Sequence, residues 1–161
     1  SIYLHFADKE SVLRAICETD VVALATSQKR IFDIADPVER MLMLGRGYAE
    51  FALSHPNHYR LMFMTTHTPR HPNDLSLEQN HPEQDAYFQL QLVVNDVFNA
   101  GLFKPELKDA DLIAQTIWAG MHGVCALQIT MAEDTWVNWR DITLRLQMMQ
   151  SVLISGLLKS K

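Results

Sequence analysis

Apolar residues recur every three or four positions along most of the chain, the spacing of one face of an α-helix. This pattern predicts six helices, over about residues 8–32, 37–55, 57–64, 83–100, 110–131 and 136–158. The prolines fall between these segments or at their first residues, and no Asn-Gly or Asp-Gly dipeptide suggests a β-hairpin. The predicted fold class is all-α, a helical bundle.

Capping residues mark several helix ends. Asp8 is the expected N-cap of the first helix, Asp36-Pro37 starts the second, and Gly101 is the expected C-cap of the fourth. Residues 65–82 contain three prolines and three histidines with little periodicity, which predicts a long loop. The first helix carries an apolar stripe of Leu13, Cys17, Val21 and Leu24.

The last two helices are unusually apolar. Residues 110–131 are apolar almost all round, which indicates burial on more than one side. We expect these two helices to pair with their copies in a homodimer through a four-helix interface. The expected interface residues on the last helix are Ile142, Leu146, Met149 and Leu153.

Composition narrows the class of protein. The 161 residues are 48% apolar and 20% charged, which is typical of a folded domain. The net charge is -5 and no basic run is present, so this chain alone is a poor candidate for binding nucleic acid. No apolar stretch reaches the ~18 residues needed to cross a bilayer, and no signal peptide is apparent, so we expect a cytoplasmic protein. Cys17 and Cys125 could form a disulfide, although two small core residues fit a reducing compartment better.

Motifs for catalysis and metal binding are missing. We find no glycine-rich phosphate loop and no G-x-S-x-G, so we expect no enzyme and no cofactor. A zinc site is disfavoured because the histidines lack regular spacing and no cysteine accompanies them: His55, His58, His67, His71 and His81. We therefore expect no bound metal.

The first sixteen residues carry a specific pattern. The stretch SIYLHFADKESVLRAI resembles the end of the helix-turn-helix in the tetracycline-repressor (TetR) family of bacterial transcription regulators. The resemblance implies that residues 1–7 are a remnant of a DNA-binding domain cut inside its recognition helix. Residues 8–161 would then form the ligand-binding and dimerisation domain.

A second resemblance lies further along the chain. HPNHYRLMF (55–63) and WAGMHGVCAL (118–127) are similar to the TetR regulatory-domain subgroup named for its Trp-His-Gly signature. In the intact protein, Tyr3, His5 and Lys9 would contact the DNA backbone. For Tyr3, packing inside the helix-turn-helix is the alternative.

The expected function is that of a ligand-responsive transcription regulator, a repressor, which binds operator DNA when full-length. A small apolar or aromatic effector would bind inside the bundle. His122 would either orient this ligand or bond to a neighbouring helix. The expected pocket residues are Phe51, Met62, Phe63, Trp118, Met121 and His122. Two alternatives remain: a small helical enzyme using Cys125 and His122, and a helical interaction module without ligand.

Overall fold

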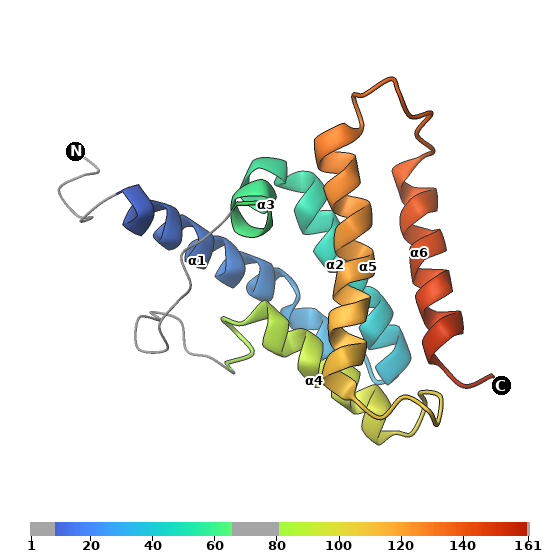
Figure 1. The fold of residues 1–161 in the computed structure, drawn as a ribbon. Coiled ribbons are helices and arrows are strands. Elements are labelled where there is room, and N and C mark those ends of the chain that lie inside the picture. The colour runs from blue at the N-terminus through green and yellow to red at the C-terminus, as the bar shows by residue number, and fades with distance from the viewer. Residues whose placement is uncertain (1–8, 66–80, 161) are drawn as a thin grey trace.

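The computed structural model describes residues 9–65 and 81–160, and within them the chain is a bundle of helices (Figure 1). Helix α5 stands at the centre of the view with α6 beside it, while α1 extends away from them. Residues 1–8, and with them the expected cap Asp8, lie outside the described part. The elements are α1 (Lys9–Ser27), η2 (Lys29–Asp33), α2 (Pro37–Ser54), α3 (Pro56–Phe63), α4 (Ala86–Asn99), α5 (Ala110–Met131) and α6 (Ile142–Leu157). The predicted all-α fold is confirmed.

Aspartate side chains set the start of four helices. Asp36 accepts hydrogen bonds from the amides of Val38 and Glu39, and Asp85, Asp109 and Asp141 cap α4, α5 and α6 in the same way. Each carboxylate satisfies amides that have no partner inside their own helix. Gly101 follows α4 with a φ of 67°, the left-handed conformation expected of a helix-ending glycine.

Three predicted helix boundaries were wrong by more than one residue. The fourth helix begins at Ala86 instead of Glu83, because the Asp85 carboxylate caps it there. The first helix ends at Ser27 instead of Phe32, because the chain tightens into the 3₁₀ turn η2. This turn brings Ile31 and Phe32 against the core. The sixth helix begins at Ile142 instead of Trp136, because the Asp141 carboxylate caps it there.

The core consists of three apolar clusters arranged around α2. One joins α2, α4 and α5 through Met41, Val94 and Ile117, and a second joins α2, α3 and α5 through Ala52, Tyr59 and Cys125. The third joins α1 to α2 and α3 through Leu24, Phe51 and Met62. Helix α1 therefore packs on the same helices that form the rest of the core.

Helix α5 is long and apolar enough, by length and composition alone, to cross a bilayer, contrary to the expectation from the sequence. The central helix of a soluble bundle passes the same test, and α5 packs against α2, α4 and α6. The observation is thus weak evidence for a membrane protein.

Candidate functional site

A cavity of about 150 Å³ lies between α1, α2, α3, α4 and α5. Its wall is mostly aliphatic and aromatic, the usual composition of a small-molecule site. Helix α1 contributes Val21, Leu24 and the following Gln28, so a molecule in the cavity would touch the first helix directly. The remaining lining residues are Met41, Leu44, Gly45, Tyr48, Met62, Phe63, Asp85, Ala86, Tyr87, Leu90, Ile117, Trp118 and Met121.

Four of the six residues predicted for the pocket lie on this wall: Met62, Phe63, Trp118 and Met121. Phe51 does not, because its ring is buried in the α1–α2–α3 cluster and stacks on His55, with ring centroids 4.9 Å apart. His122 is also absent from the wall, because its ring stacks on Tyr59 behind Tyr48. The expected orienting role of His122 therefore has no direct geometric basis.

Four side chains form a hydrogen-bonded network behind the wall. Trp118 Nε1 donates to Tyr48 Oη at 3.1 Å, and Tyr48 Oη lies 2.8 Å from Tyr59 Oη. His122 Nδ1 lies 2.6 Å from Tyr59 Oη and 3.0 Å from Tyr48 Oη. One arrangement satisfies all four groups: Trp118 donates to Tyr48, Tyr48 to Tyr59, and Tyr59 to Nδ1 of a neutral His122.

Burial keeps this network uncharged. It raises the pKa of Tyr48 to about 12, shifts the pKa of Tyr59 further upward, and lowers the pKa of His122. Each shift disfavours the charged form, because a charge in an apolar interior loses its hydration. The network therefore fixes Tyr48 and Trp118 against the cavity and presents no ion to it.

Cys125 is not suited to act as a nucleophile. Its side chain is fully buried, and burial raises the pKa of the thiol to about 11. A reactive cysteine needs an exposed, electropositive setting that favours the thiolate. Cys17 is also a buried thiol, and its Sγ donates to Leu61 O at 3.8 Å, so the two cysteines form no disulfide.

Sequence reasoning missed the polar residues of the wall. Gln28 is 3% exposed, and its Nε2 donates to Leu44 O at 3.3 Å. Asp85 caps α4 at the cavity edge, where its carboxylate accepts from the amide of Phe88 at 2.9 Å. The Asp-Ala-Tyr helix start was a usable signal for Asp85. The sequence pattern gave no signal for Gln28, because Gln28 lies inside the helix predicted over residues 8–32.

The histidine of α3, His58, contacts a carboxylate of the protein itself. His58 Nδ1 lies 2.8 Å from the carboxylate of Asp20, a buried residue of α1. Across residues 9–65 and 81–160, no group of three or more His, Cys, Asp or Glu side chains is placed to hold a metal ion. His67 and His71 lie outside this part of the chain.

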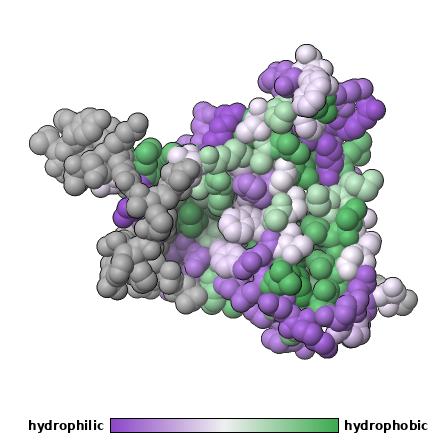
Figure 2. Space-filling view, in the orientation of Figure 1, coloured by the Kyte–Doolittle hydropathy of each residue, from purple (hydrophilic) through white to green (hydrophobic). Residues whose placement is uncertain are grey.

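An apolar surface covers α5 and α6, between hydrophilic residues at both ends of these helices (Figure 2). Leu144, Met148 and Val152 of α6 are spaced four apart, and each is about 60% exposed or more. Leu112 and Leu127 of α5 are also exposed. Such a patch marks a contact surface more often than an ordinary solvent face.

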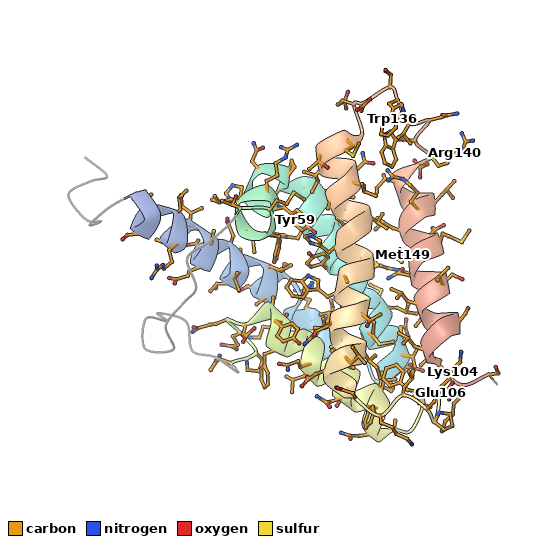
Figure 3. All side chains as sticks on the ribbon, in the orientation of Figure 1. Tyr59, Lys104, Glu106, Trp136, Arg140 and Met149 are labelled. Carbon is orange, nitrogen blue, oxygen red and sulfur yellow. The ribbon has the colours of Figure 1, made fainter. Side chains whose placement is uncertain are left out.

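The α6 residues predicted for the dimer interface are less exposed than Leu144, Met148 and Val152, and their role in an interface stays a prediction. Leu146 and Met149 pack on the α2–α3–α5 cluster, and Met149 lies between α5 and α6 (Figure 3). A Cβ added at Gly120 of α5 would meet Met149 Sδ at 3.1 Å and Leu153 Cδ1 at 3.2 Å. Ile142 is only partly exposed. The predicted stripe mainly joins α6 to its own chain, and the exposed stripe is Leu144, Met148 and Val152.

The residues predicted to contact DNA cannot be placed. Tyr3 and His5 lie outside the described residues. Lys9 is the first residue of α1, but its side chain is also outside them. Their roles stay predictions.

Comparison with known protein families finds one family that matches this chain. Residues 41–136 match the family described as "Tetracyclin repressor-like, C-terminal domain", which covers more than half of the chain and most of the cavity wall. The chain belongs to this family. A search of curated proteins finds no match.

A solved structure supports the fold of this TetR-like domain. A protein of unknown function from Rhodococcus sp. RHA1 superposes with a TM-score of 0.75 and is 22% identical. The match covers 96% of this chain and 76% of that one. At this identity the likeness concerns the fold alone.

Proposed function

We propose that the chain is the effector-binding and dimerisation part of a ligand-responsive transcription regulator, a repressor, of the TetR family. The observation that carries the proposal is the cavity, because one wall of it is the helix that follows the DNA-binding motif in the family's pattern. Residues 1–7 belong to that motif in this proposal, and residues 8–161 to the regulatory domain. Regulators of this family are generally not enzymes, and their regulatory domains are typically soluble. The protein would act in the cytoplasm.

The mechanism follows from which side chains a ligand would touch. A molecule in the cavity would lie between Leu24 of α1 and Trp118 of α5, which both line it. Such a ligand favours the arrangement of α1 that leaves room for it, and so shifts the population between two positions of that helix. In a dimer, this changes the spacing of the two DNA-reading units. The exposed α5–α6 surface supports dimerisation, the usual assembly of the family.

The experiment uses the full-length protein, with its helix-turn-helix. We expect it to select a palindromic site from a pool of random duplexes and to bind it as a dimer. Lys9→Ala should weaken binding about equally on all sequences and lower the salt slope by about one, because a phosphate contact releases a counterion. Absence of any preferred site, or a change in base preference in Lys9→Ala, would contradict the proposed roles.

The enzyme alternative, with Cys125 and His122, has no observation in its favour. The thiol is protonated and fully buried, and His122 Nδ1 is occupied by tyrosine hydroxyls. A helical interaction module without ligand would not need a cavity of about 150 Å³ lined by four aromatic rings. We therefore retain the proposal that the chain is part of a transcription regulator.

A further inference from the structure

The cavity offers a ligand very few polar groups. Among the described residues its wall contains no lysine, arginine or histidine, and its one charged side chain is the Asp85 carboxylate. An anionic ligand would lose its hydration there without gaining a cationic partner, which is costly. The wall thus selects against carboxylates and phosphates.

Five side chains on the wall carry a polar group, and four of them are already engaged. Tyr48 Oη takes the Trp118 N–H and shares hydrogen bonds with Tyr59 and His122, so its hydroxyl is fully used. The Asp85 carboxylate caps α4. Tyr87 Oη accepts from the exposed side chain of Gln115 at 3.3 Å, on the outer side of α5.

Gln28 is the fifth of these polar side chains. Because Leu44 O can only accept, the atom of Gln28 that faces it at 3.3 Å must be the amide nitrogen. The amide oxygen Oε1 is then the remaining acceptor, and it receives no hydrogen bond from any residue in 9–65 or 81–160. This side chain is 3% exposed and lies on the cavity wall, and its Oε1 is not among the fully buried polar atoms that lack a partner, so this oxygen is accessible to a donor in the cavity.

Resting on the proposed function, we infer that the effector is a small, uncharged aromatic molecule that donates one hydrogen bond to Gln28 Oε1. The volume of about 150 Å³ matches an apolar protein cavity of about the same size that holds benzene. The rings of Tyr48, Phe63, Tyr87 and Trp118 supply aromatic contact. Gln28 is the residue that determines specificity, in place of His122.

The test compares three probes by isothermal titration calorimetry. Indole carries an N–H donor, benzofuran has nearly the same shape without the donor, and benzoate is an anion of similar size. The parent protein should bind indole at least about fivefold more tightly than benzofuran, the value of one neutral hydrogen bond, and should not bind benzoate.

Two matched variants identify the residue. Gln28→Met keeps the length of the side chain and removes the acceptor, so it should bring the indole-to-benzofuran ratio to about one. Gln150→Met is the control, because Gln150 is also buried and also donates to a carbonyl of α2, that of Leu42 at 2.9 Å, but lies off this wall. It should keep the preference of the parent. Circular dichroism and urea unfolding check that both variants fold.

The possible results separate this inference from the proposed function. Equal binding of indole and benzofuran by the parent, an indole preference that survives in Gln28→Met, or binding of benzoate overturns the inference and leaves a ligand site in place. Failure of the parent to bind either neutral probe overturns the inference and also contradicts the cavity as an effector site.

Discussion

Tyr59 Oη lies 2.6 Å from His122 Nδ1, which links α3 to α5 behind the cavity. Tyr59 is fully buried, so its hydroxyl cannot exchange this partner for water. Tyr59→Phe should therefore lower the free energy of unfolding by about 1–2 kcal/mol, measured by urea denaturation. Tyr87→Phe is the control, because that hydroxyl meets an exposed side chain, and it should change stability by less than about 0.5 kcal/mol. Equal effects of the two variants would show that the network does not stabilise the fold.

The same network predicts how stability depends on pH. Burial lowers the pKa of His122 below its ordinary value of 6.5, so the unfolded chain binds this proton more readily than the folded one. The stabilisation is fully present above pH 6.5 and is lost as pH falls toward the folded-state pKa. Among the described residues, the ionisable groups in contact with the ring are Tyr48 and Tyr59, and burial raises the pKa of each far above this range.

His122→Asn isolates this effect, because the asparagine oxygen can accept from Tyr59 without titrating. The parent should lose more stability than His122→Asn between about pH 7.5 and about pH 5.5, measured by urea unfolding. If the two proteins respond to pH in parallel, His122 is not held neutral by the fold.

The exposed stripe on α6 predicts which substitution converts a dimer into monomers. Met148→Glu places a charge on the exposed apolar patch, and we expect a folded monomer where the parent sediments as a dimer. Leu146→Glu instead places the charge inside the chain's own α2–α3–α5 cluster and should reduce the free energy of unfolding by at least about 3 kcal/mol. Ile16→Glu, on the exposed side of α1, should leave the dimer intact. A monomeric parent, or a dimer that survives Met148→Glu, would contradict this assignment.

The two glycines of α5 have different surroundings, so replacing each with alanine should have different effects on stability. Gly123 has open space where a Cβ would lie, so Gly123→Ala should stabilise the helix by up to about 1 kcal/mol. At Gly120 the added carbon would meet Met149 and Leu153 of α6 at 3.1–3.2 Å, so Gly120→Ala should lose this gain or destabilise. Thermal unfolding of the two variants gives the comparison. Equal stabilisation by both would show that α6 does not pack closely on Gly120.

The helices could be predicted from the sequence because their periodicity and aspartate caps are local signals. The switch to a 3₁₀ turn after Ser27 could not, since burial of Gln28 and contacts of Ile31 decide it. The same dependence on long-range contacts explains which residues of the cavity could be predicted. Met62, Phe63, Trp118 and Met121 were found from their apolar side chains, while the wall's polar residues depend on which helices meet. Helix α6 carries two apolar stripes. The sequence alone does not show which of them packs against the rest of the chain, because this depends on where α5 lies.

The central claim, that the cavity beside α1 holds a small molecule, is tested by filling it. Val21 lies on the cavity wall, whereas Val22, its neighbour on α1, does not. We expect calorimetry to find one indole per chain for the parent and for Val22→Trp, and none for Val21→Trp, whose side chain occupies the space itself. Unchanged binding of indole by a folded Val21→Trp would place the ligand elsewhere and contradict the account.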